Sequence, residues 1–190
     1  MLTLEQLHTR GERNYVHGTD LYFELLMSIK RLDFDIASLY LKFNKPIHRQ
    51  PKIVENELQA NASAIYRYKT ECGEKFGSIV ETSKTLEAPI LCIEGNIRKS
   101  MSYTPNDSNV TFFYDGSFPL INFLLFGSKH LLKEIEPNRE FWFSSILCDF
   151  PGLECDGEYM LNVNSSFSKM FKIEAVKDGS RLAMISLISR

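Results

Sequence analysis

The feature that most limits the possible folds of this chain is an internal repeat of about a hundred residues. The segment 73–79 recurs as 179–185, and both copies read glycine, polar, basic, large apolar, small, any residue, isoleucine. Each copy follows a strand-like alternation, at residues 65–69 in the first half and 171–175 in the second. A strand that runs into a glycine turn and a second strand indicates a β-hairpin. Because the same hairpin occurs twice, we expect two related units fused in one chain.

The elements ahead of each hairpin also follow one order: a small turn, a helix and two strands. Apolar spacing predicts a first helix over residues 19–32 and an almost entirely apolar second helix over 117–135. A helix that is apolar on every side is a buried one. The stretch 91–109, with Gly95, Pro105 and several Asn and Ser, is predicted to connect the halves.

These patterns together predict an α+β fold built from two units. We expect two long buried central helices wrapped by one continuous antiparallel sheet. The predicted units are residues 1–100 and 101–190.

One stretch resembles a known superfamily. It comprises His17-Gly18, the following helix, and Leu-Tyr-Leu-Lys-Phe-Asn-Lys-Pro-Ile at residues 39–47. This stretch resembles the hot-dog superfamily of acyl-thioester enzymes, in particular its MaoC-like hydratases and the double hot-dog dehydratases of fatty acid and polyketide synthesis. The resemblance covers residues 15–83, with a fainter echo over 112–190. It implies a double hot-dog fold and a substrate carried on coenzyme A or an acyl carrier protein, with no further cofactor.

The resemblance also implies a candidate catalytic pair. Double hot-dog dehydratases carry a His before the first central helix and an Asp at the second, and His17 and Asp115 stand in these places. The correspondence is positional, since the glycine and proline that follow the family's histidine are not in place. It implies His17 as base and Asp115 as acid in the loss of water from a 3-hydroxyacyl thioester. The residues expected to contact the substrate are Tyr15, Gly18, Tyr114 and Gly116.

The chemistry fits these residue types. Histidine has an ordinary pKa of about 6.5, which suits proton transfer near neutrality. Backbone N–H groups at a helix start can hold a thioester oxygen as it gains negative charge. The structural alternatives are a turn histidine bonded to the backbone, and an aspartate that caps a helix or forms an Asx-turn.

Two other functions fit the same fold. A thioesterase or acyltransferase would use a carboxylate on the central helix, for which Asp20 and Glu24 are candidates. A non-catalytic protein that binds acyl thioesters would need no acid and base at all. A fold alone does not choose among these functions.

Charge and composition limit the kinds of binding partner and the cell compartment that we expect. The net charge is −2 and the Lys and Arg residues are scattered, which argues against nucleic acid binding. The N-terminus lacks a signal-peptide pattern, and no apolar run approaches the roughly 20 residues of a membrane span, so we expect a cytoplasmic protein. The four cysteines lack zinc-site spacing, which predicts no metal. Sheet edges that pair within the chain would allow a monomeric pseudo-dimer, and a homodimer is the alternative.

Overall fold

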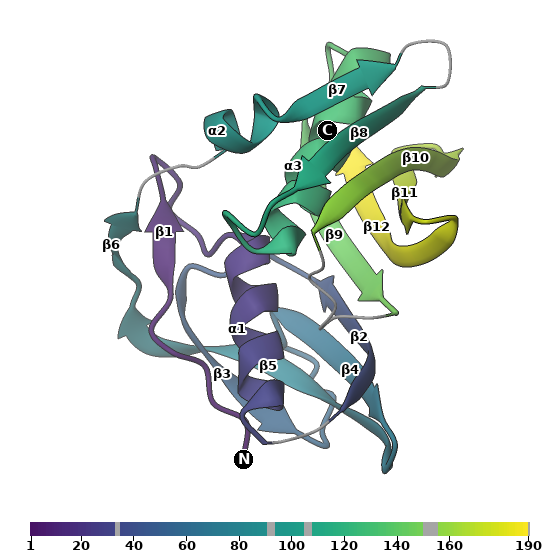
Figure 1. Cartoon of the computed structure of the whole chain (residues 1–190). Coiled ribbons are helices and arrows are strands. Elements are labelled where there is room, and N and C mark those ends of the chain that lie inside the picture. Colours follow the sequence, from purple (N-terminus) through teal and green to yellow (C-terminus); the bar gives the residue numbers. More distant parts are fainter. Residues whose placement is uncertain (33–34, 91–93, 105–107, 150–155, 190) are drawn as a thin grey trace. The chain divides into compact units, whose positions relative to one another are not determined.

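The chain forms two compact units, Met1–Cys92 and Ile93–Arg190. The computed structural model describes residues 1–32, 35–90, 94–104, 108–149 and 156–189 (Figure 1). Both units combine helix with antiparallel sheet, so the predicted α+β class is confirmed. The continuity of the sheet across the units, and their predicted limits of 1–100 and 101–190, stay predictions.

Unit 1 packs α1 against β2 of an antiparallel sheet whose strand order is β3-β5-β4-β2. The side chains of Leu21, Leu25 and Ile29 on α1 are fully buried, as the helical spacing predicts. A separate parallel pair joins β1 to β6. The elements are β1 (His8–Arg10), α1 (Gly18–Lys30), β2 (Ile36–Phe43), β3 (Arg49–Glu55), β4 (Ala64–Thr70), β5 (Gly73–Thr85) and β6 (Glu87–Ile90).

In unit 2, α3 packs against the antiparallel strands β7, β8, β9, β10 and β12 (Figure 1). The strand order is β9-β12-β11-β10-β8-β7. Most of α3 is buried, as its apolar sequence predicts. The elements are α2 (Glu94–Arg98), β7 (Met101–Thr104), β8 (Asn109–Tyr114), α3 (Leu120–Ile135), β9 (Phe141–Cys148), β10 (Gly157–Phe167), β11 (Met170–Lys177) and β12 (Ser180–Ser189).

The two predicted helices are present but shorter than predicted. With 13 and 16 residues, α1 and α3 are the only helices of seven or more residues in the described parts of the chain. Their length is close to the average for globular proteins, so the prediction of two long helices is not confirmed. The second helix begins at Leu120 rather than at residue 117 because Pro119, its N-cap, is still extended at ψ 133°. No described helix is long and apolar enough to cross a membrane.

The two units share the order of elements along the chain but differ in the order of strands across the sheet. Both units follow their main helix with two strands and a hairpin. In unit 1, β2 pairs with β4, the first hairpin strand, whereas in unit 2 β9 pairs with β12, the last one. Residues 168–169 join β10 to β11 so tightly that these strands must pair. The longer connection 56–63 lets β5 lie beside β3 instead. The two related units therefore differ in how their hairpin strands pair.

The predicted connection over residues 91–109 is also more structured than expected. It contains the short helix α2 and the strand β7, which pairs with β8. The Asn, Ser and Gly residues of this stretch predict a loop because they favour loops by local propensity. Pairing with β8 is a tertiary interaction, which local propensity does not predict. Both elements belong to unit 2.

Candidate functional site

His17 lies at the start of α1 as its N-cap residue. Its backbone is extended, with φ −71° and ψ 135°, and its carbonyl accepts hydrogen bonds from the N–H groups of Asp20 and Leu21 at 3.0 and 3.2 Å. The residue is only 3% exposed, and Nδ1 of its ring lies 2.8 Å from Oγ1 of Thr19. This contact fixes the orientation of the imidazole.

The segment ahead of His17 is held by two backbone contacts. The N–H of Val16 donates to the carbonyl of Ile47 at 2.8 Å, and Val16 forms an isolated antiparallel bridge with Thr9. The Val16 side chain is buried. His17 is therefore held from both sides, by the bridge before it and by the helix after it.

Tyr15, a predicted substrate-binding residue, is half-buried and packs edge-on against His48, with ring centroids 6.3 Å apart. Nδ1 of His48 lies 2.9 Å from the carbonyl oxygen of Asn14, which ties this ring to the same segment. Gly18 is the first residue of α1. The substrate contacts of Tyr15 and Gly18 stay predictions.

Asp20, the first rival carboxylate, is engaged in an ion pair. Both of its oxygens accept hydrogen bonds from Arg10, one of them from Nε at 2.8 Å and the other from Nη2. The two side chains are 8% and 17% exposed. A carboxylate held in this two-point contact is a poor nucleophile because its lone pairs are already directed at the guanidinium.

Glu24, the second rival, lies under the N-terminal segment. The pKa of its carboxyl is raised, first by burial and then by the charge of Glu5. The backbone N–H of Glu5 and the charge of Arg31 oppose this shift in part. The same segment is tied to α1 where the N–H of Thr3 donates to Oγ of Ser28 at 2.9 Å. Seven residues of helix separate Glu24 from His17, roughly 10 Å along the axis. Glu24 is therefore not part of the site at the start of α1.

Asp115 follows β8 and is exposed. Its Oδ1 accepts a hydrogen bond from the N–H of Ser117 at 2.9 Å, which is an Asx-turn. Hydrogen bonds from the side chain and the backbone of Ser117 lower the pKa of the Asp115 carboxyl. An ionised carboxylate can accept a proton but has none to donate, so this environment favours the structural alternative for Asp115. Gly116, with φ 76°, completes the turn.

His17 and Asp115 do not hold equivalent positions in their units. The N-cap of α1 is His17, whereas the N-cap of α3 is Pro119, and Asp115 precedes that proline by the whole turn. The predicted positional match between the two residues is therefore wrong with respect to the helices. Their action as a catalytic pair stays a prediction.

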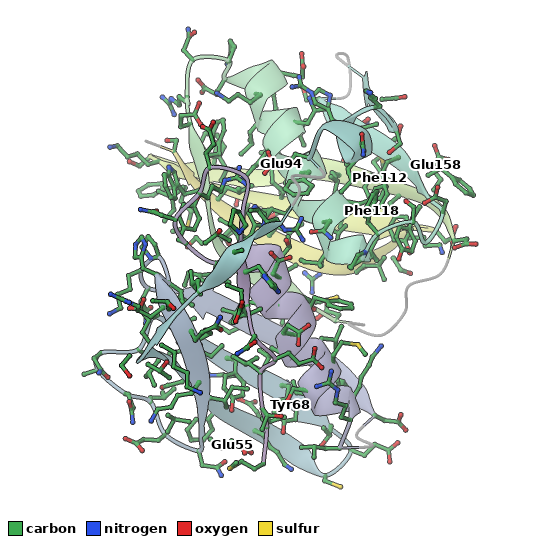
Figure 2. All side chains as sticks on the ribbon, turned by 90° about the vertical axis from the view of Figure 1, so that its left-hand side faces the viewer. Glu55, Tyr68, Glu94, Phe112, Phe118 and Glu158 are labelled. Atoms are coloured by element: carbon green, nitrogen blue, oxygen red, sulfur yellow. The ribbon has the colours of Figure 1, made fainter. Side chains whose placement is uncertain are left out.

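Tyr114 belongs to the core of unit 2. It is buried and lies edge-on to Phe123 and Tyr159, with ring centroids 5.3 and 6.1 Å apart. Phe112, labelled in Figure 2, stacks on the same two rings. These contacts give Tyr114 a packing role, and its predicted substrate contact stays a prediction.

Asn122 is a residue that the sequence analysis missed. It is only 2% exposed, and its Oδ1 is buried without a hydrogen-bond partner in the described parts of the chain. Its N–H donates to the carbonyl of Pro119 at 2.9 Å, just as the N–H of Asp20 donates to His17. Asn122 is thus the counterpart of Asp20. The signal for it was visible, since it is the single polar residue in the run 120–126.

No cluster of three or more His, Cys, Asp or Glu side chains suited to a metal ion occurs among the described residues.

Comparison with known proteins identifies the fold. No protein-family model and no curated protein matches the chain. The trans-acyltransferase polyketide synthase enoyl-isomerase superposes with a TM-score of 0.53 and 10% identity, over 100% of this chain and 99% of that one. The chain has a hot-dog fold. The tesB protein MAP1729c of Mycobacterium avium subspecies paratuberculosis has the same fold, with a TM-score of 0.52 and 11% identity over 97% of this chain and 91% of that one. The predicted resemblance is confirmed for the fold.

Proposed function

We propose that this hot-dog protein is a dehydratase or hydratase of 3-hydroxyacyl thioesters, with His17 as the proton-transferring residue. The observation that carries the proposal is the buried imidazole at the N-cap of α1, held through Nδ1 by Thr19. A buried and oriented imidazole at a positive helix end suits proton removal next to a carbonyl. The acyl group would be delivered on coenzyme A or an acyl carrier protein.

The reaction balances with one imidazole. Nε2 of His17 removes the α-proton, the electrons of the C–H bond form the Cα–Cβ double bond, and the Cβ–O bond breaks. The imidazolium returns its proton to the departing hydroxyl, which leaves as water. Hydration is the same path in reverse. The thioester oxygen gains negative charge during the first step, and the first N–H groups of α1, which have no partner inside the helix, are placed to stabilise it.

This proposal assigns the acid step to His17 instead of Asp115. Because the pKa of the Asp115 carboxyl lies below its ordinary value, the side chain is ionised at neutral pH. We expect Asp115→Asn to change kcat/KM by less than about twofold, since asparagine accepts the same turn hydrogen bond. Steady-state kinetics on a 3-hydroxyacyl thioester checks this. A loss of most of the turnover would return the acid role to Asp115.

The proposed function is tested by separating two products. The purified chain is incubated with 3-hydroxybutyryl-coenzyme A, and the enoyl thioester and the free thiol are measured in parallel. We expect the enoyl thioester without thiol release, and the reverse reaction from crotonyl-coenzyme A. Thiol release alone would indicate a thioesterase and move the search to other carboxylates. Binding without either product would indicate the non-catalytic alternative.

A further inference from the structure

Arg10 carries a donor group that the described protein leaves unsatisfied. Its side chain is 8% exposed, and Nε and Nη2 both donate to Asp20. Nη1 is buried and has no hydrogen-bond partner among the described residues. An arginine stays charged at every accessible pH and has five N–H donors. A buried donor without an acceptor loses its hydration without compensation, so this position favours an oxygen ligand.

Asp20 holds the guanidinium at the first turn of α1. Asp20 is the third helical residue after the N-cap His17, and side chains at these two positions lie close together at the start of a helix. Figure 1 shows β1, the strand that carries Arg10, at the same end of unit 1 as the start of α1. The ion pair therefore brings the guanidinium to the helix end at which His17 lies.

The backbone bridge leads to the same place independently. Thr9 and Val16 are antiparallel partners, so Arg10 and His17, which follow them, are diagonal neighbours across this bridge. Side chains alternate along an extended chain, which puts Arg10 and His17 on the same side of this bridge. Diagonal neighbours are about 7–8 Å apart at the backbone, within reach of a long side chain.

We propose that Arg10 binds the thioester carbonyl oxygen of the substrate through Nη1, beside the first N–H groups of α1. This inference rests on the proposed function, because it places the acyl thioester next to His17. Asp20 cancels the guanidinium charge, so the site offers a directed donor with little net positive charge, which suits a neutral carbonyl better than a free anion. As the α-proton leaves, the oxygen becomes negative and the charge-assisted hydrogen bond to Nη1 strengthens.

The test compares two stable analogues of butyryl-coenzyme A, one that has the carbonyl and one that lacks it. In one, a methylene replaces the thioester sulfur and the carbonyl is kept; in the other, S-butyl-coenzyme A, the carbonyl is absent. We expect wild type to bind the carbonyl analogue roughly 10- to 100-fold more tightly, the usual effect of a hydrogen bond to a charged donor. Arg10→Met and Arg10→Lys should bind both analogues about equally, because lysine keeps the charge but cannot span Asp20 and the ligand together.

Arg31→Met is the matched control, since Arg31 pairs with Glu5 at the exposed C-terminal end of α1 and its loss should leave the preference for the carbonyl intact. An unchanged preference in folded Arg10→Met would overturn the proposal. If the Arg10 variants fail to fold, the wild-type measurement tests the proposal by itself. Equal affinity of wild type for both analogues overturns the role of Arg10. Wild type that dehydrates 3-hydroxybutyryl-coenzyme A yet shows equal affinity overturns the Arg10 proposal alone. Wild type that neither binds the analogues nor turns over substrate overturns the proposed function as well.

Discussion

Replacing His17 by glutamine is expected to lower kcat for 3-hydroxyacyl thioester dehydration by about 10²- to 10⁴-fold, the usual contribution of a positioned acid or base. Glutamine fills a similar volume and can still bond to Oγ1 of Thr19, but it cannot take up the α-proton. The loss should therefore fall on kcat, whereas the affinity for the carbonyl analogue should change little. Single-turnover measurements with excess enzyme separate the two quantities.

His48→Gln serves as the control, because His48 is an exposed histidine of the same unit whose ring contacts Tyr15 and the Asn14 carbonyl. It should keep most of the wild-type turnover. Equal thermal unfolding temperatures of wild type and both variants would show that neither change acts through stability. A folded His17→Gln protein with wild-type kcat would contradict the assignment of proton transfer to His17.

The local elements of this fold were readable from the sequence. The spacing of Leu21, Leu25 and Ile29 predicts the buried face of α1, and all three side chains are fully buried. Glycine at positions 73 and 179 predicts two hairpins, and both residues adopt the positive φ that such turns require. These sequence patterns predict the elements correctly because they depend on only a few neighbouring residues.

The sequence does not predict the order of strands across the sheet. The sequences of the two hairpins are alike, yet β4 lies beside β2 whereas β12 lies beside β9. The difference comes from the connections 168–169 and 56–63, since a short turn forces neighbouring strands together and a longer loop does not. Repetition in a sequence therefore predicts which elements occur, and connection length decides how they pair.

The candidate site was predicted only in part for a related reason. His17 was found because it precedes a recognisable helix. Arg10 and Asp20 meet through the pairing of β1 and the packing of its segment on α1, which no spacing rule reveals. Asp115 matches His17 only when the second helix starts at residue 117, as the sequence predicts, and not at Leu120, where α3 begins. An error of three residues at a helix end changes which side chain stands at its N-terminus.

Gly77→Ala is expected to lower the free energy of unfolding by about 1–3 kcal/mol, because the added methyl group overpacks the sheet. Gly77 lies in β5 between Glu55 of β3 and Tyr66 of β4. A methyl group at this position would lie 2.5 Å from the Tyr66 hydroxyl and would also overlap the Val54 carbonyl oxygen. The tyrosine is buried and the carbonyl is backbone, so neither can move away without disturbing the sheet.

Denaturant unfolding of the purified variants measures this effect, and Gly95→Ala is the matched control. Nothing lies within 4 Å of a methyl group at Gly95, which is in the short helix α2, so the same change there should be neutral or stabilise slightly. Tyr66→Phe removes one of the three close contacts at Gly77. The double variant Tyr66→Phe/Gly77→Ala should regain only part of the lost stability, because the Val54 carbonyl and the ring carbon Cζ remain. Equal unfolding free energies for Gly77→Ala and Gly95→Ala would show that β5 does not pack against β3 and β4 as described, and the strand order of unit 1 would have to be revised.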